Sequence, residues 1–336
     1  SLTKTFNACL TDNLSIALVS LFNISVLGIL QSMIQIYYMS QNKEDKFLNI
    51  VGLMSGTSLD GIDLSLISTN GKDYISFKKN FFYSYTNSTR KILIKCIEGN
   101  EFILKDKTLK IRLNKFVTNL HFKALKLSGF LTQADIIGFH GQTILHNPKK
   151  KETLKLGDPK ALANLTKKKV VFDFRENDIN NFGQGAPLAP IFHKTIIEKY
   201  KFNLPCCFIN IGGISNITYW DGQDLIGFDA GPGNVLIDKY SQLYLNINFD
   251  FNGNIASSGS YNIELVEKFL KNPYFKKSFP KSLDKLHFNR EFKELELKKL
   301  NANDSLATLV NFSVRSIEKG LLMLPHTPKS MIITGG

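Results

Sequence analysis

Two stretches of the chain share one pattern of apolar, β-favouring residues broken by a short polar turn. Residues 49–67 and residues 207–220 each contain an apolar run, a turn of glycine with serine or threonine nearby, and a second apolar run. This pattern predicts a β-hairpin in both places. Glycines in such turns allow positive φ and a close approach of the backbone to a ligand. The hairpins form a weak internal repeat, separated by about one domain length.

Strands and helices are predicted to alternate around these hairpins. Apolar residues at helical spacing predict a helix over residues 109–124. Further helices are predicted at 160–166, 186–200, 234–244 and 305–323, the third of them capped by the side chain of Asn234. Further strands are predicted at 135–138, 170–174, 227–229 and 329–334. We expect an α/β fold with mixed sheets and two lobes around a cleft. The first lobe is predicted over residues 48–205 and the second over 206–336, after an extra segment at 1–47.

The two ends of the chain are unusual. Residues 14–38 are apolar and long enough to span a bilayer, although serine, asparagine and glutamine dilute them. They can be a membrane anchor, an uncleaved signal-like segment, or sequence translated from upstream of a start at Met39. We expect no membrane association unless the segment is a real anchor. The chain stops at Gly336, directly after a predicted strand and within a glycine turn, so we expect the second lobe to be truncated.

Composition narrows the class of protein. A length of 336 residues suits two domains, and the net charge of +13 comes mostly from lysine, with runs at 149–151 and 167–169. These runs can bind nucleic acid or form a solvated surface. Because no motif of interleaved aromatic and basic residues accompanies them, we predict no nucleic-acid partner. Four cysteines without CxxC spacing fit a reducing, cytoplasmic compartment and argue against zinc.

The turn of the first hairpin is a candidate phosphate site. Turns of this kind point several backbone N–H groups at one place. Ser55, Thr57 and Ser58 add hydroxyl groups, and Asp60 can hold Mg²⁺ directly or through water. The alternative is an ordinary hairpin turn, but a second such hairpin and a third glycine turn at residues 334–336 favour a nucleotide. The chain has no Walker segment and no GxGxxG after a strand.

Polar residues after predicted strands supply the candidate chemistry. Asp229, at a strand end, is placed like a general base, although an aspartate there can simply cap the turn or the next helix. His140, Gln142 and Thr143 lie in a predicted exit loop and can bind sugar hydroxyls, or His140 can be structural. Arg175 can hold a carboxylate bidentately, or it can pair with Asp173 or Asp178.

Taken together, these motifs resemble the anhydro-N-acetylmuramic acid kinase family. The matching runs are Gly52–Asp63, Phe139–Thr143, Leu156–Asp158, Asp173–Arg175, Gly183–Leu188, Asn210–Gly213, Phe228–Asn234, Pro273–Phe275 and Pro280–Ser282. They cover the chain from about residue 48 to its end, in order. The MSGTSLDG and GPGN runs are the most specific of them.

The resemblance implies an actin-like ATPase fold with two ribonuclease-H-like lobes, which bind ATP and Mg²⁺ between them, and a homodimer. It implies a kinase that opens the 1,6-anhydro ring of its amino sugar with water and phosphorylates O6, with Asp229 activating the water. It implies nucleotide contacts at Gly56, Thr57, Ser58, Leu59, Asp60, Gly61, Ile62, Asp63, Gly212, Gly213, Gly335 and Gly336, with Asp60 also the candidate metal ligand. It implies sugar contacts at His140, Gln142, Thr143, Arg175, Gly231 and Asn234.

The sequence departs from the family pattern in two places. Glu176-Asn177 stand where the family often has a basic pair, so contacts to an anionic substrate are expected to differ there. Residues 283–286 read Leu-Asp-Lys-Leu, where the family pattern has Thr-Gly-Arg-Glu. We therefore expect that loop to differ from the family's.

Overall fold

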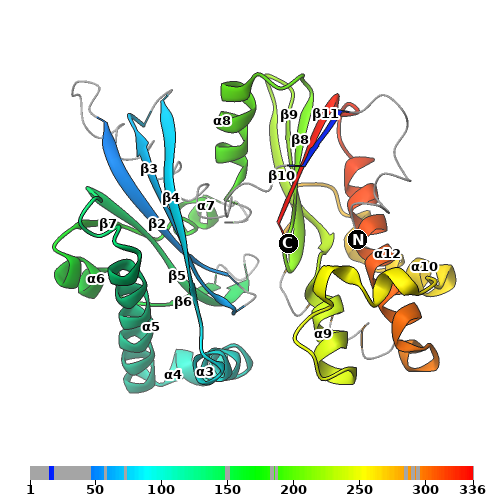
Figure 1. Ribbon diagram of the computed structural model, residues 1–336, viewed down its shortest axis with the longest axis horizontal. Coiled ribbons are helices and arrows are strands. Elements are labelled where there is room, and N and C mark those ends of the chain that lie inside the picture. The colour runs from blue at the N-terminus through cyan, green and yellow to red at the C-terminus, as the bar shows by residue number, and fades with distance from the viewer. Residues whose placement is uncertain are drawn as a thin grey trace. The chain divides into compact units, whose positions relative to one another are not determined.

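A computed structural model describes residues 15–18, 47–56, 59–71, 74–147, 152–181, 185, 188–283, 287–288, 292 and 296–335. The chain divides into two compact units, each described by itself (Figure 1). Leu21–Ile196 form the N-terminal unit. Ile197–Gly336, together with Ser1–Ser20, form the C-terminal unit.

The N-terminal unit is built on one mixed sheet. Its strands are β2 (Leu48–Ser55), β3 (Gly61–Thr69), β4 (Ile75–Ser84), β5 (Ile136–Asn147), β6 (Glu152–Leu156) and β7 (Lys169–Val171). The first three form an antiparallel meander, and β5 returns parallel to β2, giving the order β4-β3-β2-β5. The other edge of β5 pairs first with β7 and then with β6.

The C-terminal unit repeats this strand order. Its strands are β8 (Cys206–Ile211), β9 (Ile214–Trp220), β10 (Leu225–Pro232), β11 (Ser330–Gly335) and β1 (Ser15–Leu18). Again three strands form an antiparallel meander, and a later strand, β11, returns parallel to the first of them, giving β10-β9-β8-β11. The internal repeat predicted from the two hairpins therefore extends to four strands of each sheet.

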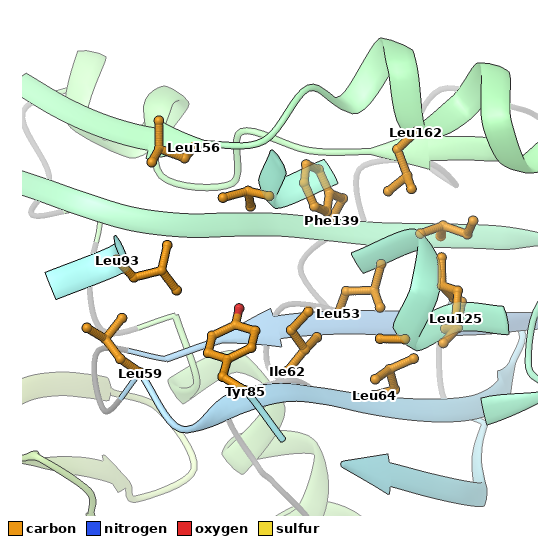
Figure 2. Packing of buried hydrophobic residues seen from close by; sticks show 14 of the residues in the cluster. Leu53, Leu59, Ile62, Leu64, Tyr85, Leu93, Leu125, Phe139, Leu156 and Leu162 are labelled. Carbon is orange, nitrogen blue, oxygen red and sulfur yellow. The ribbon is translucent and has the colours of Figure 1, made fainter. Parts of the chain in front are cut away.

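Helices cover the sheet of the N-terminal unit. They are α3 (Asn87–Glu98), α4 (Asn100–Lys105), α5 (Lys107–Ser128), α6 (Pro159–Thr166), α7 (Glu176–Asn180) and α8 (Pro190–Tyr200), the last crossing the boundary between the units. In α5, Asp106 caps the first turn and Gly129 ends the helix in the left-handed conformation. Figure 2 shows Leu125 of α5 and Leu93 of α3 in one core with Leu53, Leu64 and other residues of the sheet. Each such buried side chain contributes roughly 1.5–3 kcal/mol.

The C-terminal unit is organised around one long helix, α12 (Ala302–Leu321), which contacts β9 and β10. The other helical elements are α9 (Val235–Tyr244), η2 (Phe251–Gly253), η3 (Ala256–Ser258), α10 (Ile263–Leu270), η4 (Pro273–Lys276) and η5 (Glu296–Lys299). The Phe312 ring of α12 stacks on Phe269 of α10 at 4.3 Å between centroids. The apolar face of α12 thus joins the sheet to the helical layer.

Most predicted elements are confirmed, with local corrections. Both hairpins form, and the helices predicted at 109–124, 160–166, 234–244 and 305–323 correspond to α5, α6, α9 and α12. The exit loop predicted at His140–Thr143 is wrong, because these residues lie inside β5. The strand predicted to stop at Asp229 continues to Pro232, and the strand predicted at 170–174 ends at Val171. Helix α8 begins at Pro190.

Of the apolar segment at residues 14–38, the structure describes only Ser15–Leu18. These residues form β1, which pairs in parallel with β11 at the edge of its sheet. The three interpretations of the rest of the segment concern residues outside the described part of the chain. Among the helices that are described, none combines the length and the apolar character needed to cross a membrane.

Candidate active site

The glycine turn between β2 and β3 lies directly beside the His140–Thr143 motif. Strands β2 and β5 are parallel neighbours, and Ser55 stands opposite Gln142 in their register. The Gln142 amide Nε2 donates to the Gly56 carbonyl at 3.2 Å, and the Ser55 hydroxyl donates to the Gly141 carbonyl at 3.0 Å. Ligands of open α/β sheets bind outside the carboxyl ends of such parallel strands. The fold therefore brings together two motifs that lie 86 residues apart.

The turn is held in a conformation that its side chains do not favour by themselves. Leu59 has a φ of 57°, in the left-handed region that non-glycine residues seldom adopt, and its side chain is buried in the core. The Leu59 N–H donates to the Gly56 carbonyl at 3.4 Å, and the Asp60 carbonyl accepts from the Tyr85 N–H at 2.8 Å. Core packing thus stabilises a strained turn, as is common at ligand sites.

A β-bulge shapes the His140–Thr143 motif. Gly141 has a φ of 70°, and the register between β2 and β5 shifts at this point. A Cβ on Gly141 would come within 2.6 Å of the Leu156 carbonyl oxygen, so the position requires glycine. Bulges re-aim side chains next to active sites. Here the Gln142 Oε1 and the Thr143 Oγ1 are buried and lack a hydrogen-bond partner among the described residues.

His140 and Arg175 form a buried pair next to the bulge. The His140 Nδ1 lies 3.0 Å from the Gly141 carbonyl, so this nitrogen carries the proton, and the Nε2 accepts from the Arg175 Nε at 3.1 Å. Burial, and then the Arg175 charge, lower the pKa of His140 well below its usual value and keep the ring neutral. The guanidinium also donates to the Gly185 carbonyl at 3.2 Å. Asp173, one suggested ion-pair partner of Arg175, forms an ion pair with Lys155.

A second histidine lies beneath the turn. The His121 Nδ1 donates to the Val117 carbonyl at 2.9 Å, which leaves the Nε2, 3.3 Å from the Ser55 Oγ, as an acceptor. The single Ser55 hydroxyl proton is shared between this nitrogen and the Gly141 carbonyl. Burial lowers the pKa of His121 to about 4.

This burial predicts acid sensitivity. The folded-state pKa of His121 lies below its unfolded value of 6.5, so the unfolded chain takes up more protons and stability falls as pH drops from 6.5 towards 4. Between pH 7 and pH 5, the loss from this group is roughly 2 kcal/mol. The slope of unfolding free energy against pH should be smaller in His121→Gln than in the wild type. Equal slopes for the wild type and His121→Gln would contradict the prediction.

In the C-terminal unit, the β8–β9 glycine turn is bonded to the start of α9. The Gly212 carbonyl accepts from the Asn234 N–H, and the Gly213 carbonyl accepts from the N–H groups of Gly233 and Val235, all at 2.8–3.1 Å. A Cβ on Gly233 would overlap the Gly212 carbonyl oxygen. The predicted side-chain cap at Asn234 is wrong, because the Asn234 side chain makes no cap bond. The carbonyl groups of the β8–β9 turn accept the N–H groups at the start of α9 instead.

Asp229 lies at a bulge in β10 and is almost fully buried. The register between β10 and β9 shifts between Asp229 and Gly231. The Asp229 N–H donates to the Lys281 carbonyl at 3.0 Å, and the carboxylate Oδ2 accepts from the Leu283 N–H at 2.8 Å. Its main chain and its carboxylate are thus fixed by one loop, residues 281–283. A cap of the following helix, the alternative role for Asp229, is absent among the described hydrogen bonds.

The Tyr274 hydroxyl and the main chain of Lys281 both contact Asp229. The Tyr274 hydroxyl donates to the Asp229 carbonyl at 2.5 Å, and burial raises the pKa of this phenol. The Lys281 ammonium lies 4.8 Å from the centre of the Tyr274 ring and 5.6 Å from that of Phe228. Burial, and then Lys277, lower the pKa of Lys281 to about 8. These contacts give a structural reason for the Pro273–Phe275 and Pro280–Ser282 runs.

The remaining predicted positions are placed as follows. Leu59 and Ile62 have buried side chains, so only their main chains can meet a ligand. Gly231 packs against α12, where a Cβ would lie 2.5 Å from the Ser316 Cβ. Gly335 pairs with Ile211, beside the turn at Gly212. Thr57, Ser58 and Gly336 lie outside the described residues, as do Gly183, Gln184, Ala186 and Pro187 of the loop before α8.

Asp60 is exposed at the turn, with Asp63 partly buried in β3. Across the described parts of the chain, no group of three or more histidine, cysteine, aspartate or glutamate side chains is arranged to hold a metal ion. A single carboxylate fits Mg²⁺, which is typically bound by one or two carboxylates plus substrate phosphates.

The fold is that of a mixed α/β protein with two sheets, each containing a hairpin with a glycine turn, and with a buried carboxylate at a bulge. This arrangement is suited to a small-molecule kinase. The family described as "Anhydro-N-acetylmuramic acid kinase" matches residues 48–336, and the chain belongs to this family.

Curated relatives of that name agree. The protein from Rhodopseudomonas palustris strain CGA009 is 38% identical over 300 residues, which cover 86% of this chain and 80% of the relative. The one from Pelagibacter ubique is 35% identical over 311 residues, covering 87% and 80%. The one from Brucella suis is 38% identical over 301 residues, covering 85% and 79%.

Proposed function

We propose that this protein is an ATP-dependent anhydro-N-acetylmuramic acid kinase, which opens the 1,6-anhydro ring with water and phosphorylates O6. The products are N-acetylmuramic acid 6-phosphate, an intermediate of peptidoglycan recycling, and ADP. The family membership supports the reaction. The observation that carries the assignment of roles is the buried carboxylate of Asp229, fixed at a bulge in β10 by the Leu283 N–H.

The chemistry requires a base for water. The water oxygen forms a bond to the anomeric carbon, the bond from that carbon to O6 breaks, and the water proton passes to the Asp229 carboxylate. The O6 released by the ring attacks the γ-phosphorus of ATP, and ADP leaves. Because the base is held from its main chain and from its carboxylate, little reorganisation is needed during the reaction.

The glycine turns are the proposed nucleotide contacts. Each follows a strand with a parallel neighbour: the β2–β3 turn lies beside β5, and the β8–β9 turn lies beside the end of β11. Backbone N–H groups in such turns bind phosphate. When Mg²⁺ is bound, it neutralises charge on the transferring phosphate, and Asp60 is the side chain proposed to hold it.

The repeated strand order supports an actin-like fold. An antiparallel meander followed by a strand parallel to its first member occurs in both units. We propose that these units are ribonuclease-H-like lobes of a nucleotide-binding protein. A cytoplasmic location is also proposed, since Cys96, Cys206 and Cys207 are free, buried thiols. The resemblance further predicts a homodimer.

His140–Thr143 and Arg175 are the proposed sugar contacts of the N-terminal unit. The Gln142 Oε1 and the Thr143 Oγ1, both buried without described partners, suit hydroxyl groups of a substrate. Arg175, oriented by the neutral ring of His140, suits a carboxylate.

Gln142 should couple this sugar site to the nucleotide turn. Gln142→Met keeps the shape but removes the amide that donates to the Gly56 carbonyl. We expect the KM for ATP to rise about 5-fold, because the net value of such a bond is about 1 kcal/mol. Steady-state kinetics with each substrate varied in turn would measure this. Thr143→Val is the matched control, since Thr143 makes no described bond to the turn and should leave the KM for ATP unchanged. An equal rise of the KM for ATP in both variants would contradict this coupling.

The function itself is tested by sugar-dependent ADP release from the protein expressed from its full gene. ATP and anhydro-N-acetylmuramic acid together should release ADP, and neither alone should do so. A panel of related anhydro amino sugars in the same assay separates this substrate from its relatives. ADP release that does not depend on any anhydro sugar would defeat the proposal.

A further inference from the structure

A row of four polar residues crosses the sheet of the C-terminal unit. In the register of its strands, Thr334 of β11 stands opposite Asn210 of β8, Asn210 opposite Asn216 of β9, and Asn216 opposite Asp229 of β10. Directly opposed residues on neighbouring strands lie about 4.5–5.5 Å apart and share a face. Asn216 is therefore the side chain nearest to Asp229 within the sheet.

The row lies on the face of the sheet that α12 does not cover. The sequence neighbours of the row, Ile333, Ile209, Ile217 and Phe228, pack into one core with Val314 and Ile317 of α12. Because side chains alternate between the faces of a strand, the row faces away from that core. Polar residues in a line on this face require an explanation other than packing.

Asn216 is the member of the row whose bonding is incomplete. Asn210 Oδ1 accepts from the Thr334 hydroxyl at 3.2 Å. The Asn216 Oδ1 is shielded from solvent and has no hydrogen-bond partner among the described residues. A buried acceptor without a partner costs about 1–3 kcal/mol, and such a group in a native protein often marks a bound molecule.

We propose that Asn216 binds the attacking water together with Asp229. The proposal rests on the proposed function, which requires a water beside Asp229. A water that attacks through its lone pair has two hydrogens to place. One is transferred to the Asp229 carboxylate, and the Asn216 Oδ1 accepts the other, which stays on the oxygen as the new anomeric hydroxyl. The carboxylate and the amide together orient the lone pair towards the anomeric carbon.

The test uses a substitution that separates this role from a structural one. Asn216→Leu removes the acceptor but also removes a buried polar atom without a partner, so the melting temperature should stay the same or rise. The kcat should fall on the order of 100-fold, with KM for both substrates within about 3-fold. Asn210→Leu is the matched control. It breaks the bond from Thr334, so its melting temperature should fall, while its kcat should fall less than that of Asn216→Leu.

A pH profile gives a second, independent measurement. Asn216→Asp places a second carboxylate beside Asp229, and like charges raise the pKa of the pair. The acidic limb of kcat/KM should move up by about one pH unit. Asn210→Asp, one strand further away, should move it less. Among the described residues, Tyr274 of η4 is the titratable side chain that contacts Asp229, and Lys281 of the following loop contacts it through the main chain, with Lys277 near Lys281. They are the same in all variants.

The outcomes are distinct. Suppose that the wild type shows sugar-dependent turnover. A kcat of Asn216→Leu near the wild-type value, or equal shifts of the acidic limb of kcat/KM in Asn216→Asp and Asn210→Asp, would then overturn the role of Asn216 but not the proposed function. A kcat loss in Asn216→Leu that parallels a loss of melting temperature would show that the residue is only structural. A wild-type protein without sugar-dependent turnover would overturn the proposed function, and the role of Asn216 with it.

Discussion

Asp229→Asn should reduce sugar-dependent ADP release by a factor of about 10³–10⁴, the largest effect expected from any single substitution here. The amide cannot take the proton of the attacking water. It can still accept the Leu283 N–H, and the main-chain bonds to Lys281 and Tyr274 remain. The KM values should therefore change little, and the loss should appear in kcat.

The same contacts supply the control for this experiment. Because these three hydrogen bonds of Asp229 are preserved in Asp229→Asn, the melting temperature should stay near that of the wild type. If Asp229→Asn unfolds, its activity says nothing about catalysis. Asp229→Glu then replaces it in the experiment, because it keeps the negative charge but displaces the carboxylate. Substantial turnover in a folded Asp229→Asn would exclude Asp229 as the base.

Gly233→Ala should be the most damaging substitution in the glycine turns. A Cβ at this position overlaps the Gly212 carbonyl oxygen, which belongs to the backbone and cannot move aside without distorting the β8–β9 turn. We expect a loss of about 3 kcal/mol in unfolding free energy and at least a 10-fold rise in the KM for ATP, because the displaced turn is a proposed phosphate contact. Chemical denaturation and nucleotide titration would measure the two effects.

Gly213→Ala is the matched stability control for this effect. It lies in the β8–β9 turn, whose Gly213 carbonyl accepts the Gly233 N–H, but its added Cβ would meet only the Val235 Cβ at 3.9 Å, an ordinary van der Waals distance. Its unfolding free energy should be close to that of the wild type. An equal loss of unfolding free energy in both variants would contradict the prediction, because it would mean that a movement of the turn relieves the overlap at Gly233.

The parts of the fold that depend on local pattern could be predicted from the sequence. Both hairpins form where a glycine turn separates two β-favouring runs, and α5 and α12 form where apolar residues recur at helical spacing. These patterns extend over only a few residues, so the elements can be predicted without knowledge of tertiary contacts.

The parts of the candidate site that depend on register could not be predicted. The bulges at Gly141 and next to Asp229 break the two-residue period of a strand. The sequence pattern therefore predicts a loop at His140–Thr143 and a strand end at Asp229. The bond from Leu283 to Asp229 joins residues 54 positions apart. No local pattern indicates it, although the Pro280–Ser282 run marks the neighbourhood. No sequence signal singles out Asn216, because the pattern of the second hairpin points to its glycines as the ligand contacts.

The mass of the sugar product, formed by the wild-type protein in ¹⁸O-labelled water, tests the central claim most directly. Hydrolytic ring opening coupled to phosphorylation predicts a product that has gained one phosphate and one water per ADP, with the label in the new anomeric hydroxyl. A phosphorylated sugar that retains its anhydro ring and contains no solvent oxygen would show a simple hydroxyl kinase, and would contradict the role given to Asp229.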